Sequence, residues 1–134
     1  GVSPERRDAF RQFGINLGLA FQVQDDWLGL WGDSAQTGKS NYSDLVSGKK
    51  TLPVLYALGS GGAFAARWKH GGVQPEEVEH LAQTLVAEGA QQYTERTAGR
   101  LTGNALDALV AAGEGSDTAR TLRQLAETLL KRTN

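Results

Sequence analysis

Asp25 and Asp26 stand side by side in the otherwise apolar stretch FQVQDDWLGLWGD, residues 21–33. An ionised carboxylate is costly to remove from water unless an opposite charge compensates it, and two neighbouring carboxylates also repel each other. Magnesium suits such a pair, because it is a hard cation that prefers oxygen ligands and keeps water and substrate phosphates in its shell. A calcium loop of the EF-hand type is excluded by the missing D-x-D-x-D-G spacing. The simplest alternative is a solvated helix face, where most paired acids lie.

Lysines follow the acid pair along the chain, with Lys39 in GDSAQTGKS and Lys49 and Lys50 in SGKKT. A lysine ammonium is a point charge that binds phosphate oxygens. The first stretch is not a nucleotide-binding phosphate loop, because Asp33 stands where the first glycine is required and the loop follows a helix instead of a strand. Lys39 alone is most simply an exposed loop residue. Acids that hold a metal ion, with lysines nearby for phosphate oxygens, together predict a diphosphate site.

A long helix is predicted to carry the two acids, running from Pro4 to about Trp31. Ser3 is suited to cap its first turn, and Gly32 stands where the helix should stop. At about 100° per residue, apolar side chains cover the helix nearly all round, which predicts a core helix buried on most of its sides. One narrow sector holds small and polar residues, namely Gly18, Gln22, Asp25, Asp26 and Gly29. We therefore expect this sector to line a cavity with a cationic partner.

The rest of the chain also has helical patterns, so the predicted fold class is all-α. Neither an alternating strand pattern of useful length nor an internal repeat is found in the sequence. Pro53 predicts a kink or break within a helix over 44–58, and residues 59–72 are a glycine-rich connection with an apolar centre. The glutamates after Pro75 are expected to be a solvated helix start, favoured by the helix dipole. The remaining helices are predicted over 75–89, 89–112 and 117–132.

Composition narrows the class of protein further. The chain has 134 residues, 40% of them hydrophobic and 22% charged, which is enough for one globular domain with a modest core. A formal net charge of −1 gives no basic field for nucleic acid, and no apolar run in the sequence is long enough for a transmembrane helix. Cysteine is absent, which fits a reducing compartment, and we expect a cytoplasmic protein. Methionine is absent too and the chain opens GVSPERRDAF, which predicts a piece of a longer polypeptide.

An ordered set of motif residues extends from the acid pair into the following region. In FQVQDDWLGLWGDSAQTGKSNYSDLVSGKKTLPVLYAL the chain resembles the C-terminal half of the trans-isoprenyl diphosphate synthases, or polyprenyl synthetases. Their second aspartate-rich region reads approximately FQ-x-x-DD-x-x-D, followed by GK, a single Asp, and GK-x-T. The matching residues are Phe21, Gln22, Asp25, Asp26, Gly38, Lys39, Asp44, Gly48, Lys49, Thr51 and Pro53. The preceding FGINLGLA and the C-terminal helices are also similar to the family, so the resemblance spans the whole chain.

The resemblance implies a magnesium-dependent prenyltransferase of isoprenoid biosynthesis, built as an isoprenoid-synthase-type helical bundle. Such an enzyme ionises an allylic diphosphate and adds isopentenyl diphosphate to the resulting cation, which gives a longer linear isoprenyl diphosphate. By matching position, Asp25 and Asp26 are expected to bind Mg²⁺, with Asp44 in a supporting role. Preorganised positive charge helps a diphosphate to leave, which gives a physical reason for metal ions and lysines at one site.

Other matching residues are assigned to the substrates by the same resemblance. Lys39 and Lys49 are expected to bind the allylic diphosphate and to stabilise the leaving charge, and Thr51 is expected to bind the diphosphate with them. Phe21 and Gln22 are expected to line the cavity near the reacting carbon, where an aromatic face can stabilise a cation. A phenylalanine of the core is equally compatible with Phe21.

The chain departs from the family pattern in two ways. The third aspartate of the motif is Gly29 here, so one outer carboxylate is lost, and we expect weaker metal binding without loss of catalysis. The first aspartate-rich motif of the family belongs to an N-terminal half that these residues do not include. Residues 1–134 are therefore predicted to be the C-terminal portion of a single all-α prenyl synthase domain, catalytically incomplete on its own.

Two other functions stay open from the sequence. One is a catalytically silent partner subunit of the family, for which Gly29 is an argument; the other is a class I terpene synthase, which cyclises the same substrates. Retention of the acids and lysines argues against the silent subunit, because such a subunit has no need to bury acids. The lysine pair and the GK-x-T region argue against the cyclase. The resemblance also implies a homodimer, whereas these residues determine neither the product chain length nor the allylic primer.

Overall fold

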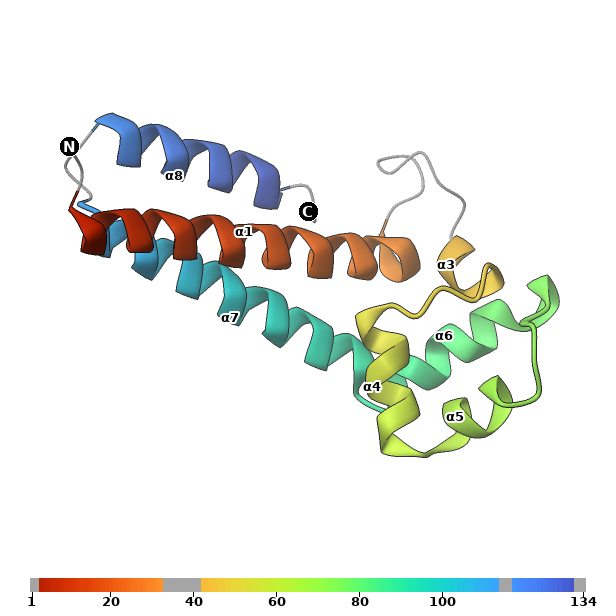
Figure 1. The fold of residues 1–134 in the computed structure, drawn as a ribbon. Helices are drawn as coiled ribbons and strands as arrows, with labels where there is room; N and C mark the ends of the chain where they lie inside the picture. Colours follow the sequence, from red (N-terminus) through yellow and green to blue (C-terminus); the bar gives the residue numbers. More distant parts are fainter. Residues whose placement is uncertain (1–2, 33–41, 114–116, 132–134) are drawn as a thin grey trace. The chain divides into compact units, whose positions relative to one another are not determined.

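The computed structural model describes residues 3–32, 42–113 and 117–131, and Figure 1 shows them as helices joined by short connections. Within these ranges no residue belongs to a β-strand, which confirms the all-α fold class. In chain order the helices are α1 (Pro4–Trp31), α3 (Ser43–Val46), α4 (Leu52–Ser60), α5 (Ala63–Trp68), the short 3-10 helix η1 (Pro75–Glu77), α6 (Val78–Ala87), α7 (Ala90–Ala111) and α8 (Asp117–Leu130).

The bounds of α1 are those that the sequence predicts. The amide of Arg6 donates to Ser3 Oγ at 3.2 Å, so Ser3 caps the first turn as expected. At the other end, the amide of Gly32 donates to the carbonyl of Leu28 at 3.0 Å. A Cβ at Gly32 would lie 2.7 Å from that same carbonyl oxygen, so the helix stop at this position depends on glycine.

The prediction that α1 is buried on most of its sides is wrong for this chain. Ile15 and Leu19 are 48% and 50% exposed, and Phe21 is 37% exposed. Buried positions, among them Phe13 and Ala20, lie between these exposed ones. Apolar residues all round a helix show that neighbours are favoured on every side. Hydropathy does not show whether the same stretch of chain supplies those neighbours.

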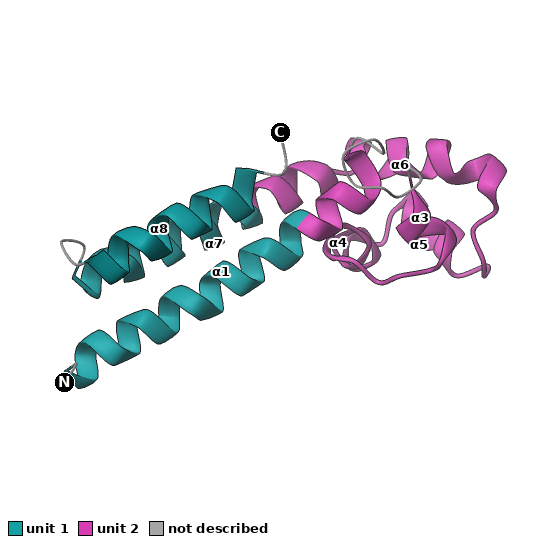
Figure 2. Ribbon diagram, turned by 90° about the horizontal axis from the view of Figure 1, so that it is seen from above, with its two compact units in different colours: residues 1–24, 97–134 teal, residues 25–96 magenta. Residues whose placement is uncertain are grey.

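The contacts divide the chain into two compact units, coloured separately in Figure 2. The first unit comprises residues 1–24 and 97–134, and the second comprises residues 25–96. Both α1 and α7 therefore contribute one part to each unit. Each unit has a buried core of its own.

In the first unit, α1, α7 and α8 pack around one small core. Its buried residues are Phe13, Ala105, Leu109, Ala119 and Ala126. At the edge of this core, Arg6 Nε donates to the carbonyl of Ala112 at 2.6 Å, just after the end of α7. The last carbonyls of a helix have no intrahelical donors and carry the negative end of the dipole, so a cation is favoured there.

In the second unit, the end of α1 and the helices α3 to α6 enclose a larger core. Phe64 is 1% exposed and stacks on Trp68, with the ring centroids 5.5 Å apart. The other buried members are Leu30, Leu45, Val54, Ala57, Val73, Leu81, Ala82, Leu85 and Ala90. Burying a leucine or phenylalanine side chain stabilises a fold by about 1.5–3 kcal/mol. This core therefore holds in place the segments that carry the predicted site.

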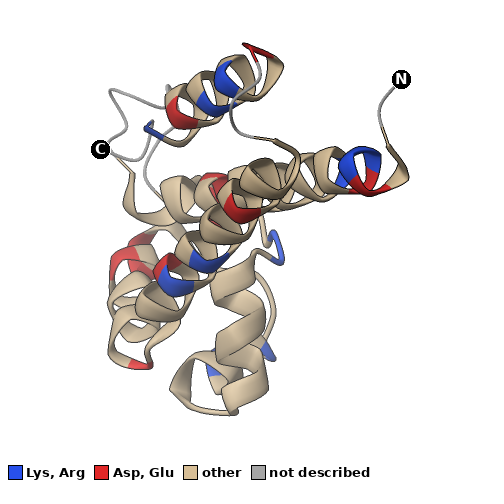
Figure 3. Cartoon of the chain, turned by 90° about the vertical axis from the view of Figure 1, so that its left-hand side faces the viewer, with Lys and Arg blue, Asp and Glu red and all other residues tan. Residues whose placement is uncertain are grey.

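Charged side chains are spread over both units. Figure 3 shows acidic and basic positions interspersed along the helices, which fits the formal net charge of −1. The described helices also include none that is both long and apolar enough to cross a membrane.

The helix predicted over 44–58 is interrupted, as Pro53 indicates. α3 ends at Val46 and α4 begins at Leu52, with Pro53 in its first turn, where an amide would have no intrahelical partner. Thr51 precedes α4 in an extended conformation, with φ −78° and ψ 170°. The interruption leaves residues 47–51, which contain the second GK motif, as a turn between two helices.

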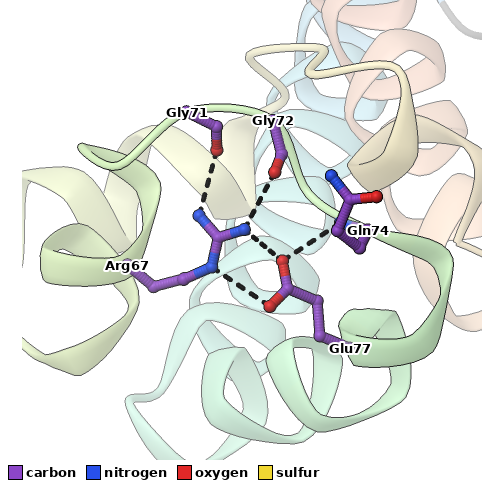
Figure 4. A network of polar contacts seen from close by, with 5 residues as sticks. All are labelled: Arg67, Gly71, Gly72, Gln74 and Glu77. Carbon is purple, nitrogen blue, oxygen red and sulfur yellow. Dashed lines mark hydrogen bonds and ion pairs between the residues drawn. The ribbon is translucent and has the colours of Figure 1, made fainter.

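The glycine-rich connection predicted over 59–72 contains a helix, α5, that the sequence analysis missed. The helix AFAARW is only six residues long and lies between glycines, so it is too short to show a helical pattern in the sequence. Figure 4 shows how Arg67 of α5 closes the turn that follows. Its guanidinium forms an ion pair with Glu77 and donates to the carbonyls of Gly71 at 3.0 Å and Gly72 at 2.8 Å. The carboxylate of Glu77 also accepts the amide of Gln74 at 3.0 Å.

The glutamates stand at a helix start as expected, and Glu77 in addition carries an ion pair that the sequence analysis did not anticipate. The hydrogen bond from Arg67, and after it the one from the Gln74 amide, lowers the pKa of Glu77 below its usual value. A carboxyl whose pKa is lowered in the folded state contributes stability above its unfolded-state pKa. That contribution is lost as the pH falls through the lowered value.

Candidate functional site

Two segments that are distant in sequence meet in the second unit. One is the last part of α1, with Asp25, Asp26 and Gly29, and the other is residues 42–52. Asp26 Oδ2 accepts a hydrogen bond at 3.0 Å from the amide of Leu52, the first residue of α4. Asp26 is 7% exposed. A carboxylate in this position satisfies an amide that has no intrahelical partner, and the helix dipole favours its charge.

Asp44 approaches the same part of α1 from the second segment. It is 8% exposed, and its carboxylate lies directly against Gly29. A Cβ at Gly29 would be 2.0 Å from Asp44 Oδ2. Gly29 follows Asp25 by four residues and Asp26 by three, and residues so spaced are neighbours on a helix surface. The Asp44 carboxylate therefore lies beside the face of α1 that carries the two acids.

A tight turn after α3 sets the course of the chain at Lys49. Gly48 has a φ of +75°, in the left-handed region that favours glycine. The turn allows the Lys49 amide to donate to the Asp44 carbonyl at 3.0 Å, and Ser47 Oγ donates to the same carbonyl at 3.1 Å. Lys49 and Lys50 are both exposed. The glycine of this GK motif thus shapes the turn, and the lysine stands on it with its backbone fixed to Asp44.

The backbone before α3 is also unusual. Tyr42 has φ 66° and ψ 15°, a left-handed conformation that residues other than glycine rarely adopt. Its carbonyl accepts the amides of Leu45 at 3.0 Å and Val46 at 3.2 Å. Such a conformation costs about 1–3 kcal/mol and persists where surrounding contacts hold it. Here it fixes the start of α3, and with it the position of Asp44.

Thr51 lies in the same segment, but its hydroxyl is enclosed. It is 2% exposed, and among the described residues Oγ1 has no hydrogen-bond partner. Its amide donates to the Lys49 carbonyl at 3.1 Å, and its carbonyl accepts the amide of Leu55 at 2.9 Å. Burial and these backbone bonds give Thr51 a role at the start of α4, whereas a contact with a diphosphate stays a prediction.

The helix sector that was expected to line a cavity has two different parts. Gly18 and Gln22 are exposed and lie in the first unit. Asp26 and Gly29 are buried in the second unit, where Asp44 and the start of α4 cover them. The cavity expectation therefore does not hold for the second part, because another segment of the chain is packed on it.

The remaining predicted residues stay predictions. Phe21 and Gln22 lie on α1 in the first unit, and both are exposed. Asp25 is half-buried and is the first residue of the second unit. Lys39 lies outside the described residues. Their roles at a reacting substrate rest on the resemblance of the motif.

Carboxylate oxygens are the donors that this region offers to a cation. Within residues 3–32, 42–113 and 117–131, no group of three or more His, Asp or Glu side chains is arranged to hold a metal ion. Mg²⁺ does not need such a cage, because it takes one or two carboxylates and fills its shell with water and phosphate oxygens. The Asp44 carboxylate puts one such donor beside the acid-bearing face of α1. The donor set therefore fits magnesium that is bound together with a phosphate ligand.

Sequence reasoning missed two features of this region. An assignment of Asp26 to a metal alone is incomplete, because its carboxylate also holds the first amide of α4. Gly29, interpreted from the sequence as a lost ligand, is the position that makes room for Asp44. A glycine on a helix surface permits another part of the chain to approach closely. The residue that approaches it becomes known only from the fold.

Comparisons with known proteins cover almost the whole chain. The family model described as Polyprenyl synthetase matches residues 1–87. A (2E,6E)-farnesyl diphosphate synthase of Mycobacterium tuberculosis is 34% identical over 140 aligned positions, which cover 98% of this chain and 39% of that protein. The crystal structure of a polyprenyl synthetase from Streptomyces coelicolor A3(2) has a TM-score of 0.83 at 34% identity, over 97% of this chain and 42% of that one.

A second solved structure is similar to the same extent. It is a geranylgeranyl pyrophosphate synthase from Corynebacterium glutamicum in complex with isoprenyl diphosphate and magnesium, with a TM-score of 0.79 at 33% identity. The match covers 97% of this chain and 38% of that one. The chain thus spans about two fifths of the length of these relatives.

Proposed function

Because this chain belongs to the polyprenyl synthetase family and has its all-α, isoprenoid-synthase-type fold, we propose that residues 1–134 are the C-terminal portion of one prenyl synthase domain. The protein that contains them joins isopentenyl diphosphate to an allylic diphosphate and makes a longer linear isoprenyl diphosphate. The observation that carries this proposal is the meeting of α1 with residues 42–52, through the 3.0 Å bond from the Leu52 amide to Asp26 and the contact of Asp44 with Gly29.

The reaction sets clear demands on the protein. The C–O bond between the allylic carbon and its diphosphate breaks, which gives an allylic cation and free diphosphate. The double bond of isopentenyl diphosphate attacks this cation and forms the new C–C bond. Loss of a proton, with the released diphosphate as the base, then restores a double bond. The protein must bind both diphosphates, stabilise the leaving charge and keep water from the cation.

Residues near the end of α1 and in the segment 42–52 are assigned to the allylic diphosphate and its leaving charge. Asp25, with Asp26 and Asp44 in support, would hold Mg²⁺, which would supply positive charge to the leaving diphosphate. Lys49 adds a further positive charge, because its exposed side chain stands on a turn whose amide is fixed to Asp44 at 3.0 Å. Lys39 has the same role on the resemblance of its GK motif.

Residues about one turn before Asp25 are assigned to the cation. Phe21 is 37% exposed among the described residues, and an aromatic face within about 6 Å attracts a cation. On the resemblance of its motif, Gln22 is assigned a place near the reacting carbon. Thr51, which directly precedes α4, is assigned to the segment that binds the diphosphate. From the family we further infer a cytoplasmic homodimer.

The full-length protein tests this function directly. Isopentenyl diphosphate is supplied with dimethylallyl, geranyl or farnesyl diphosphate, with and without Mg²⁺, and the products are separated by chain length. Magnesium-dependent linear products support the proposal and also report the chain length. Cyclic products identify a class I terpene synthase instead. Tight magnesium-dependent diphosphate binding without any product identifies a silent subunit.

Matched variants test the individual roles. Asp25→Ala is expected to abolish product formation, and residues 1–134 alone are expected to be inactive. Lys49→Ala removes one charge-assisted contact, which costs about 1.5–3 kcal/mol and lowers kcat/KM for the allylic substrate roughly 10- to 100-fold. Lys50→Ala is the control, because Lys50 is the adjacent lysine and is also exposed. If Lys49→Ala and Lys50→Ala lower kcat/KM for the allylic substrate equally, Lys49 has no specific contact with the diphosphate.

A further inference from the structure

Gln24 carries a buried amide with an incomplete set of hydrogen bonds. It lies on α1 in the first unit and is 8% exposed. Its Nε2 donates to the carbonyl of Leu130 at 3.3 Å, whereas Oε1 is enclosed and has no hydrogen-bond partner among the described residues. Turning the amide around would place two oxygens against each other, so either orientation leaves one polar atom unpaired. A buried acceptor without a donor lowers the stability of a fold.

An apolar side chain at residue 24 would avoid this cost. The buried residues on the same side of α1 are apolar, since Phe13 is 4% exposed and Ala20, one turn before Gln24, is 0% exposed. The family pattern FQ-x-x-DD leaves residue 24 unspecified. Gln24 is thus a polar residue in an apolar row, and the contact that its amide gains in exchange is the bond to Leu130.

This bond joins α1 to the end of α8. Leu130 is the last residue of α8, and the last carbonyls of a helix have no intrahelical donors. α8 packs on the core of the first unit through Ala119 and Ala126, both 1% exposed, and runs along α1 in Figure 1. The Gln24 amide therefore adds a polar contact at the point where α8 ends, beyond its last buried residue.

The place of this bond on α1 links α8 to the predicted site. Gln24 directly precedes Asp25, and α1 passes from the first unit to the second between these two residues. Gln24 is therefore the last residue of α1 in the first unit, and its amide fixes the helix there to α8. Successive residues of a helix share one regular backbone, so a contact that limits rotation of the helix at Gln24 also limits it at Asp25.

We propose that Gln24 is a positioning residue, which holds the turn of α1 that carries Asp25 to the end of α8 and lowers the stability of the fold in doing so. It acts through the backbone of α1 and touches no substrate. Loss of its amide makes the protein more stable and its binding of diphosphate weaker. The effect on binding rests on the proposed function, whereas the effect on stability does not.

Thermal unfolding without ligand tests the cost. Gln24→Met keeps an unbranched side chain of similar length and removes both polar atoms, so the melting temperature of the full-length protein is expected to rise by about 2–4 °C. Gln12→Met is the matched control, because Gln12 is an exposed glutamine of the same helix, and its effect is expected to stay within about 1 °C. An unchanged or lower melting temperature of Gln24→Met refutes the cost.

Calorimetry with inorganic diphosphate and Mg²⁺ tests the positioning. Gln24→Met is expected to weaken magnesium-dependent diphosphate binding about two- to tenfold, as the loss of one neutral hydrogen bond implies, and Gln12→Met is expected to bind like the wild type. A purely structural glutamine would leave the affinity of the more stable variant unchanged. In the synthase assay, KM for the allylic diphosphate should rise by a similar factor, with kcat within about twofold of the wild type.

Two shortened proteins test whether Gln24 acts through α8. A protein that ends at Leu130 keeps an acceptor oxygen for the amide, and Gln24→Met should weaken binding there as it does in the full-length chain. A protein that ends at Leu129 lacks this oxygen, and Gln24→Met should change its affinity by less than about twofold. An undiminished effect of Gln24→Met in the protein that ends at Leu129 refutes the link to α8.

The parts of the proposal fail in distinguishable ways. If the wild-type protein does not bind diphosphate with Mg²⁺, the proposed function fails, and the melting temperatures still decide the cost of Gln24. If the wild type binds and Gln24→Met binds equally well, the positioning role is refuted while the proposed function stands.

Discussion

Replacing Asp26 by alanine would leave the amide of Leu52 without the acceptor that it has at 3.0 Å. Asp26 is 7% exposed, so water has little access to take the place of the carboxylate. An unpaired buried amide costs about 1–3 kcal/mol, and a missing negative charge at a helix N-terminus costs about 0.3–1 kcal/mol. We therefore expect Asp26→Ala to lower the free energy of unfolding by about 2–3 kcal/mol.

Two further variants separate the causes. Asp26→Asn retains an oxygen that accepts the Leu52 amide but removes the charge, so it should cost about 1 kcal/mol. Asp8→Ala is the matched control, because Asp8 also lies on α1 and its side chain is 62% exposed, in a 3.8 Å ion pair with Arg11. Exposed ion pairs contribute little, and this variant should cost less than about 0.5 kcal/mol.

The assay is urea unfolding of the full-length protein without Mg²⁺ or substrate, so that no binding energy enters. Far-UV circular dichroism and tryptophan fluorescence report the transition, and an unchanged slope shows that the compared states are the same. If Asp26→Ala unfolds at the same urea concentration as Asp8→Ala, the Leu52 contact does not stabilise α4. If Asp26→Asn costs as much as Asp26→Ala, the charge matters and the acceptor does not.

Other parts of the fold give sharp predictions of their own. Glu77→Gln should destabilise the protein at neutral pH, and the difference from wild type should shrink as the pH falls below 4.5, since the pKa of Glu77 is lowered by Arg67; urea midpoints across pH measure it. Gly48→Ala should cost about 1 kcal/mol, because its φ of +75° is unfavourable for alanine, and equal stability would refute the turn. Phe64→Ala should cost about 3–5 kcal/mol in the same assay, because Phe64 is 1% exposed. Leu55→Ala, at 49% exposure on the neighbouring helix, should cost under about 0.5 kcal/mol, and equal losses would refute this core.

Local signals in the sequence were sufficient for much of the fold. The bounds of α1 follow from the cap at Ser3 and the stop at Gly32, which act on their own helix. The interruption before α4 follows from Pro53, whose ring restricts the preceding residues. α5 was missed because a run of six residues between glycines is too short to show helical periodicity.

The sequence predicts the residue types of a site but not the contacts that these residues make. The types and order of Asp25, Asp26, Asp44 and Lys49 predict acids and lysines of one site, and their roles toward metal and diphosphate stay predictions. The bond from the Leu52 amide to Asp26 joins residues 26 positions apart, and the Asp44–Gly29 contact depends on the turn at Gly48. Such contacts follow from how helices pack, and residue types alone do not encode them.

The bond between Asp26 and the start of α4 also bears on how a family member loses its activity. The carboxylate of Asp26 accepts the first amide of α4, so a loss of catalysis alone would leave a structural need for this residue. A buried acid is therefore expected in an active enzyme and in a silent subunit alike, contrary to the expectation that a silent subunit has no need for one. The side chain of Lys49 is exposed, and the turn uses its backbone amide. If Lys49 binds a diphosphate as proposed, a loss of catalysis would be expected to change Lys49 before Asp26.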